Sequence, residues 1–183
     1  MFTRLGLFDG RPESRRAALL DFCADALALS RDRLRLAHDP LGAPLLLIDG
    51  APTEWRISSS SRENVWLFGL TRRGPIGVDL EIFYPIEPPA AVLHPDEKKR
   101  LAALPALDAA AAFYDIWTVK EAYIKALGLG LRREVTQIRV TPGAALVLDD
   151  QRRKVTLTAA RRWRDESFGK QAICAAVILS PAP

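Results

Sequence analysis

The strongest constraint in this sequence of 183 residues is an Ala-rich segment that runs from about Asp108 to Leu127. Alanine is the most favourable residue in a helix interior, and a glycine just past the last helical residue commonly ends a helix. Gly128 and Gly130 stand at that position. The segment therefore predicts one long helix, which is the clearest element of the chain.

Shorter segments surround this helix and follow a similar order twice. The first half reads as a strand (2–8), a helix (14–29) and strands at 44–49, 54–58 and 64–71. The second half reads as a strand (76–83), a short helix (94–105), the long helix, and strands at 135–141, 145–150, 154–163 and 171–180. We therefore expect an α+β fold of two similar halves, residues 1–73 and 74–183, each a small antiparallel sheet packed with a helix.

The composition is that of a globular protein, with 49% hydrophobic and 26% charged residues and a net charge of +4. No apolar run reaches the ~20 residues that span a bilayer, and the N-terminus lacks the pattern of a signal peptide. We expect a cytoplasmic protein with no membrane partner. Cys23 and Cys174 lie far apart in apolar surroundings, which favours two buried free thiols. Two histidines and no CxxC pair argue against a zinc site.

Asp79 and Glu81 form the first pair of residues that points to chemistry. They lie two apart on a predicted strand, GPIGVDLE, so their side chains share one face. Two carboxylates beside apolar neighbours repel each other, and a divalent cation such as Mg²⁺ removes that repulsion. An exposed strand face is the alternative, and the pair alone does not decide between the two.

The second group lies on the long helix, within WTVKEAYIK. Trp117, Glu121 and Lys125 are spaced four apart and share a face, while Lys120 lies on the neighbouring stripe. Glu121 and Lys125 could be no more than a stabilising ion pair. A Glu beside two lysines could equally be a metal ligand or a general base, with the lysines placed for phosphate oxygens.

Two further segments are less specific. Four serines, Ser58 to Ser61, stand between two predicted strands, where a turn of small residues can bind a phosphate or be an ordinary loop. Residues 151–170 hold seven Lys or Arg against two acids. That stretch could be a solvated strand face or a docking patch, but it has no motif or aromatic pattern of a nucleic-acid binder, so we expect no nucleic-acid partner.

Together the motifs resemble those of the 4′-phosphopantetheinyl transferase superfamily. The strand motif IGVD-x-E and, some forty residues later, the helix motif W-[ST]-x-KE-[AS]-x-x-K match GPIGVDLE and WTVKEAYIK here. Length and the repeated order of elements resemble the surfactin-type branch, which implies a single-chain pseudo-dimer of two halves. The resemblance implies an Mg²⁺-dependent enzyme of the holo-[acyl-carrier-protein] synthase type and a monomer. It would move the phosphopantetheine arm of coenzyme A to a serine of an acidic acyl or peptidyl carrier protein.

The resemblance also implies roles for particular residues. Asp79, Glu81 and Glu121 would bind Mg²⁺, and Glu121 would also take the proton of the carrier serine. Lys125 and Lys120 would contact the phosphates of coenzyme A. Ser58 and Ser60 fall where the family holds the 3′-phosphate of coenzyme A, in the first half of the chain.

Two positions depart from the family pattern. Ser59 stands in place of a histidine and Ala43 in place of a lysine, both of which would contact the 3′-phosphate. The alternative is therefore a non-catalytic member that still binds a carrier protein or a nucleotide. The pathway served, whether fatty acid, polyketide or another secondary-metabolic route, stays open.

Overall fold

The computed structural model describes residues 3–11, 14–128, 134–141, 147–152 and 157–180. The first part of the chain contains β1 (Thr3–Asp9), α1 (Arg15–Leu27), β2 (Leu34–His38), β3 (Pro44–Ile48), β4 (Ala51–Arg62) and β5 (Val65–Thr71). The second part contains β6 (Ile76–Ile82), α2 (Pro95–Leu101), α3 (Ala106–Leu127), β7 (Ile138–Thr141), β8 (Val147–Asp150), β9 (Leu157–Asp165) and β10 (Ala172–Leu179). The α+β class predicted from the sequence is confirmed.

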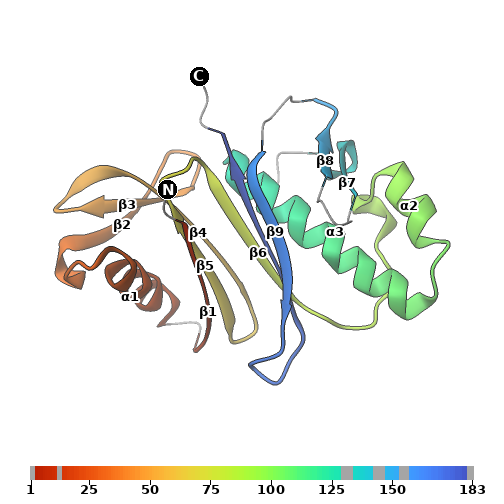
Figure 1. Cartoon of the computed structure of the whole chain (residues 1–183), viewed down its shortest axis with the longest axis horizontal. Coiled ribbons are helices and arrows are strands. Elements are labelled where there is room, and N and C mark those ends of the chain that lie inside the picture. The colour runs from red at the N-terminus through yellow and green to blue at the C-terminus, as the bar shows by residue number, and fades with distance from the viewer. Residues whose placement is uncertain (1–2, 12–13, 129–133, 142–146, 153–156, 181–183) are drawn as a thin grey trace.

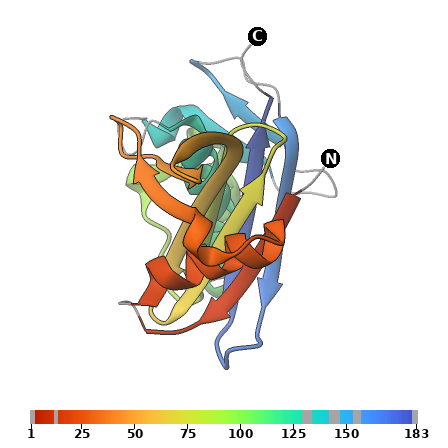
Figure 2. The same ribbon diagram turned by 90° about the vertical axis from the view of Figure 1, so that its left-hand side faces the viewer.

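The strands form antiparallel sheets that lie between the helices. One sheet has the order β1-β5-β4-β3-β2, a second has the order β6-β10-β9, and β7 pairs with β8. Figure 1 shows α1 outside the first sheet and α3 outside the second, with the two sheets facing each other in the middle. Figure 2, turned by 90°, shows α1 lying across the outer face of the five-stranded sheet.

The hydrophobic core has three layers, because side chains along the central strands point alternately to opposite faces of the sheets. On β5, Trp66, Phe68 and Leu70 pack with α1, whereas Val65 and Leu67 face the second sheet. On β10, Cys174 faces the first sheet while its neighbours pack against α3. Because successive strand residues point to opposite faces, a strand with two apolar faces packs against a helix on one side and against the other sheet on the opposite side.

Gly77 brings α3 close to β6. A Cβ atom at this position would lie 1.8 Å from the carbonyl oxygen of Ala122 and 2.6 Å from the backbone nitrogen of Ala126. Only a residue without a side chain allows the helix backbone to approach so closely. Gly128, with φ of 68°, then ends α3 in the left-handed conformation that the sequence predicted for it.

Several predictions about elements can be compared with the structure. The long helix and the strand at Ile76 are where the sequence placed them, and both cysteines are buried free thiols, as expected. Strand β2 was not predicted. The serines were predicted to form a turn, which is wrong, because Ser58 to Ser61 lie inside β4 and pair with β5. Across the described residues, no helix is both long and apolar enough to cross a membrane.

The two predicted halves meet in the turn between β5 and β6. The elements before this turn build the first sheet, and those after it build the second. Each sheet packs with a helix, but the two sheets differ in the number and order of their strands. The boundary at residues 73–74 and the pseudo-dimer relation therefore stay predictions.

Candidate functional site

Three elements bring the site together. Strand β4 contributes Ser58, Ser60 and Arg62, strand β6 contributes Asp79 and Glu81, and helix α3 contributes Trp117, Glu121 and Lys125. The strand residues are two apart and the helix residues four apart, so each element presents one face to the site. The shared face predicted for each of these motifs matches the contacts described below.

Asp79 is buried and held by two donors from different elements. Lys125 Nζ lies 2.7 Å from Asp79 Oδ1, and Ser60 Oγ donates to the same oxygen at 2.8 Å. Lys125 Nζ also donates to Ser60 Oγ and to the carbonyl oxygen of Val78. Burial raises the pKa of the Asp79 carboxyl, and the Lys125 ammonium opposes that rise. Asp79 thus ties the first sheet, the second sheet and α3 together.

Glu81 has both carboxylate oxygens engaged. Arg62 donates from Nε to Oε2 and from Nη2 to Oε1, each at 2.6 Å, in the two-pronged geometry of a guanidinium on a carboxylate. Trp117 Nε1 donates to Oε1 at 3.2 Å. With Glu81 held in this way, the part of the chain that the structure describes contains no group of three His, Cys, Asp or Glu side chains arranged to hold a metal ion.

Glu121 contributes a carboxylate oxygen that has no partner. Its Oε1 is buried and accepts no hydrogen bond from the described residues, and the same is true of Asp79 Oδ2. Burial raises the pKa of the Glu121 carboxyl, the negative charge of Asp79 raises it further, and Lys125 opposes both effects. A buried polar atom without a partner is uncommon in folded proteins. Two such oxygens in one cluster could accept a hydrogen bond or hold a cation.

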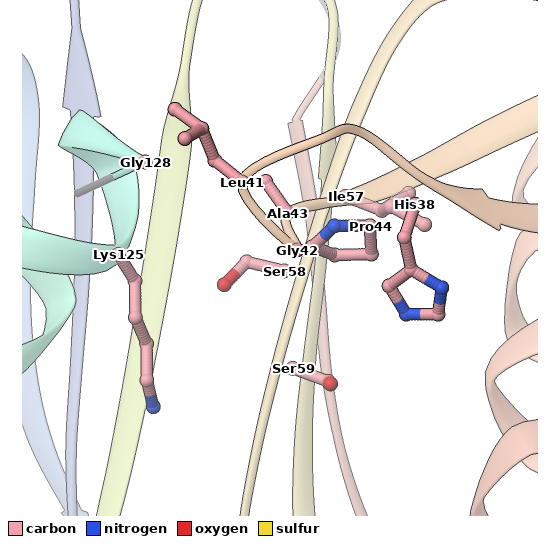
Figure 3. A pocket seen from close by; sticks show the side chains of 10 residues that line it. All are labelled: His38, Leu41, Gly42, Ala43, Pro44, Ile57, Ser58, Ser59, Lys125 and Gly128. Atoms are coloured by element: carbon pink, nitrogen blue, oxygen red, sulfur yellow. The ribbon is translucent and has the colours of Figure 1, made fainter. Parts of the chain in front are cut away.

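A pocket of about 330 Å³ opens next to this cluster. Lys125 of α3 approaches it from one side, and His38 with the turn after β2 lines the other side (Figure 3). The lining residues come from both halves of the chain: His38, Leu41, Gly42, Ala43, Pro44, Ile57, Ser58, Ser59, Lys125 and Gly128. Lys125 is the residue that belongs to both the pocket and the carboxylate cluster.

Two of the predicted phosphate contacts lie differently from the prediction. Ser58 lines the pocket, but its Oγ accepts a hydrogen bond from the backbone nitrogen of Val78. Ser60 does not line the pocket and instead donates to Asp79. Both side chains bridge β4 and β6, so one of their functions is to hold the two strands at a fixed distance.

The structure does not bring Lys120 to the site. Its side chain is fully buried on another face of α3, where Nζ bonds Glu97 Oε2 at 2.6 Å. It also donates to the carbonyl oxygens of Val92 and Val135. Burial lowers the pKa of Lys120, and the bond to Glu97 opposes that effect. A lysine with every donor used inside the protein is not available to a ligand.

Sequence reasoning assigned no contact with the carboxylates to Arg62 and no place in the pocket to His38. Arg62 binds Glu81. In the sequence, only the two-residue spacing of Ser58, Ser60 and Arg62 could have indicated this contact, and the spacing is informative only when the strand is known to continue to Arg62. His38 lines the pocket that also holds Ser59 and Ala43. No pattern near His38 indicated this, because its role depends on how β2 and β4 are placed in one sheet.

The basic stretch is partly used inside the protein. Arg162 and Arg164 on β9 both form ion pairs with Asp115 of α3, at 2.9 and 3.1 Å. Arg161 lies over the ring of Trp163. Residues 153–156, which carry two more of the positive charges, lie outside the described residues. These contacts indicate that the basic face of β9 packs against α3, and they argue against the alternative of a dedicated docking patch.

Comparison with known proteins identifies the family. The model of the 4′-phosphopantetheinyl transferase superfamily matches residues 75–177, more than half of the chain. The chain therefore belongs to this superfamily, as its two motifs indicated. The matched range contains Asp79, Glu81, Glu121 and Lys125, which are the residues at the centre of the site.

Individual relatives agree with this assignment. A putative 4′-phosphopantetheinyl transferase of Synechocystis sp. is 31% identical over 67% of this chain and 51% of its own length. The 4′-phosphopantetheinyl transferase HetI of Nostoc sp. is 27% identical over 69% of this chain and 56% of its own length. The transferase psf-1 of Bacillus pumilus is 34% identical over 39% of this chain and 31% of its own length. The chain thus spans between 31% and 56% of the length of these curated relatives.

A solved structure, the holo-[acyl-carrier-protein] synthase of Thermotoga maritima, resembles 59% of this chain and 64% of its own, at 20% identity. The TM-score is 0.46. A likeness of this size does not bear on the function of the chain.

Proposed function

We propose that this chain transfers the 4′-phosphopantetheine arm of coenzyme A to a serine of an acyl or peptidyl carrier protein. Membership of the superfamily supports the general class of reaction. The observation that carries the proposal is the position of Lys125. Lys125 lines a pocket of about 330 Å³, and its ammonium bonds Asp79 in the carboxylate cluster. A phosphate-bearing ligand in the pocket would meet this cation next to the acidic groups.

The carboxylate cluster fits a divalent cation. Asp79 Oδ2 and Glu121 Oε1 are buried without hydrogen-bond partners among the described residues, and hard carboxylate oxygens are the ligands that Mg²⁺ prefers. Asp79, Glu121 and, once released by Arg62, Glu81 would hold the ion. When bound, Mg²⁺ would offset the negative charge of the phosphates, which is the main barrier to attack on a phosphoryl group.

Glu121 is the group placed to accept a proton. The Oγ of the carrier serine forms a bond to the β-phosphorus of coenzyme A, and the bond from that phosphorus to the bridging oxygen breaks. Adenosine 3′,5′-bisphosphate leaves with the bridging oxygen, and the serine proton moves to the Glu121 carboxylate. In the metal-free chain, burial and the negative charge of Asp79 raise the pKa of Glu121. Lys125 would donate to the phosphate oxygens and offset the charge of the leaving group.

The far end of the pocket would hold the nucleotide. Ser59 and Ala43 line this region and carry no charge, but His38 lines it as well. Its imidazole offers a ring N–H to a phosphate oxygen. Ser58 and Ser60 would act on the nucleotide indirectly, because their hydroxyls are used between β4 and β6.

The test is a mass-shift assay. Purified protein, Mg²⁺ and coenzyme A are incubated with several apo carrier proteins, and intact-protein mass spectrometry looks for the added phosphopantetheine. We expect the shift with at least one carrier and a loss of at least about 100-fold in rate for Glu121→Gln, as for other general bases. Absence of a shift with every carrier would refute the proposal.

A matched control separates chemistry from folding. Asp108→Asn removes an exposed carboxylate from the first turn of the same helix. It should leave the rate within about twofold, because an exposed surface change has little effect on structure. If Glu121→Gln and Asp108→Asn both kept full activity, Glu121 would have no part in the reaction.

A second candidate function is a non-catalytic module that binds a carrier protein or a nucleotide. The observation that favours it is Glu81, whose two oxygens are already bonded to Arg62. Calorimetry would separate the two functions. Binding of carrier protein without measurable affinity for coenzyme A and Mg²⁺ would favour the module over the enzyme.

The remaining parts of the proposal concern partners and setting. Carrier proteins of this kind are expected to be acidic, and a net charge of +4 favours their approach. Both halves of the chain contribute residues to the pocket, and we expect the chain to act as a monomer. We place the reaction in the cytoplasm, in fatty-acid, polyketide or other secondary metabolism.

A further inference from the structure

We propose that Arg62 is a built-in counterion that competes with the divalent cation for Glu81. The guanidinium holds Glu81 in the metal-free chain, and the cation must displace it to gain a third carboxylate. This inference rests on the proposed function, because it assumes that these carboxylates bind a metal.

The three carboxylates differ in how many of their oxygens have hydrogen-bond partners. Asp79 and Glu121 each have one buried oxygen without a partner among the described residues. Glu81 has none, because Arg62 occupies Oε1 and Oε2 with two bonds of 2.6 Å. A metal can therefore bind the first two carboxylates without displacing a hydrogen bond from these oxygens. At Glu81 the metal would have to bind beside a guanidinium that contacts both oxygens, and the repulsion between the two cations opposes this while Arg62 stays in place.

The pair is built so that it can open. The Arg62 side chain is 52% exposed, whereas that of Glu81 is only 11% exposed. The guanidinium can therefore swing into solvent while the Glu81 carboxylate stays in place, where the charge of the metal would replace that of Arg62. The bond from Trp117 Nε1 to Glu81 Oε1 can persist, because a carboxylate oxygen accepts more than one contact.

Electrostatics explains why Arg62 lies here. The bonds to Glu81 raise the pKa of Arg62, and the charges of Asp79 and Glu121 raise it as well. One cation at the rim therefore offsets part of the repulsion among three acids. A bound divalent ion would take over this function, and two cations so close together would repel each other. The guanidinium and the metal thus exclude each other at Glu81.

The size of the effect follows from the exposure of the pair. A half-exposed ion pair is worth little, so its loss should tighten metal binding by roughly threefold to tenfold. The change would be much larger if the pair were fully buried. Because Arg62 lies at the rim, Arg62→Gln should leave the fold intact.

The experiment measures Mn²⁺ affinity in the absence of coenzyme A, by electron paramagnetic resonance of the free ion. Four proteins are compared: the unaltered chain, Arg62→Gln, Arg62→Lys and Arg15→Gln. Arg15 is the matched control, because it is an exposed arginine that bonds the neighbouring Ser61 and no carboxylate. Circular dichroism of each variant checks the fold.

We expect Arg62→Gln to bind Mn²⁺ more tightly by threefold or more, and Arg15→Gln to stay within about twofold of the unaltered chain. Arg62→Lys should lie between them, because a lysine keeps the charge but loses the two-pronged bond. Equal shifts in Arg62→Gln and Arg15→Gln would mean that net charge alone acts, which overturns the inference. So would an unchanged or weaker affinity in Arg62→Gln.

The mass-shift assay separates this inference from the proposed function. If the unaltered chain modifies a carrier but Arg62→Gln shows no gain in Mn²⁺ affinity, only the inference fails. If no carrier is modified but Arg62→Gln binds Mn²⁺ more tightly, the inference stands and the transferase proposal fails. Absence of Mn²⁺ binding in every variant overturns the inference, whatever the assay of transfer shows.

Discussion

Replacing Lys120 with methionine should lower the free energy of unfolding by about 3–5 kcal/mol. The side chains of Lys120 and Glu97 are 0% and 1% exposed, and Nζ lies 2.6 Å from Glu97 Oε2. Removing the lysine leaves the Glu97 carboxylate inside the protein without its counter-charge. It also leaves two carbonyl oxygens, those of Val92 and Val135, without their donor. Since the free energy of unfolding of a small domain is only about 5–15 kcal/mol, a loss of this size should be easy to measure.

Urea denaturation followed by far-ultraviolet circular dichroism measures this change. Lys99→Met is the matched control on exposed surface of α2 and should shift stability by less than about 0.5 kcal/mol. The double variant Glu97→Gln with Lys120→Met should recover part of the loss, because it removes the unpaired charge. A loss below about 1 kcal/mol for Lys120→Met would refute the reasoning. If Lys120→Met kept its stability but bound coenzyme A more weakly, Lys120 would be a phosphate contact, as the resemblance implies.

Two other changes test the packing of the site and the state of the thiols. Gly77→Ala should destabilise the protein by at least about 1–3 kcal/mol in urea denaturation, since its Cβ would lie 1.8 Å from the carbonyl oxygen of Ala122; an unchanged transition would contradict the close packing. Burial raises the pKa of Cys23 and Cys174 to about 12, so both should react slowly with a thiol reagent at pH 8 and rapidly once unfolded. Their pKa is raised in the folded state, so stability should fall as pH rises above about 9, where only unfolded chains release the thiol protons. Rapid labelling of the native protein would contradict this.

The sequence predicted those parts of the site that depend on local periodicity. Asp79 and Glu81 share a face because they are two apart on a strand, and Glu121 and Lys125 share one because they are four apart on a helix. Both relations need only the type of element, which the apolar pattern and the alanines indicate. The family motifs then identified the two groups as parts of one site.

Parts of the site that depend on distant contacts were not predictable in this way. Lys120 looks like a free cation in the sequence, and only the approach of Glu97 from α2 shows that it is a buried structural residue. The serines looked like a turn because they are small and polar, but pairing with β5 and contacts to β6 make them a strand. Arg62 acquires its function from Glu81, which lies on a different sheet.

The site bridges the two facing sheets, with Ser60 and Arg62 on one and Asp79 and Glu81 on the other. A ligand that binds across them can do so only while the sheets are together. At a concentration of one hundred times its dissociation constant, it would add about 2.7 kcal/mol to the resistance of that junction to separation. A ligand bound there would therefore stabilise the junction between the two sheets. Without such a ligand, we expect this junction to open first and a protease to cleave the chain there first.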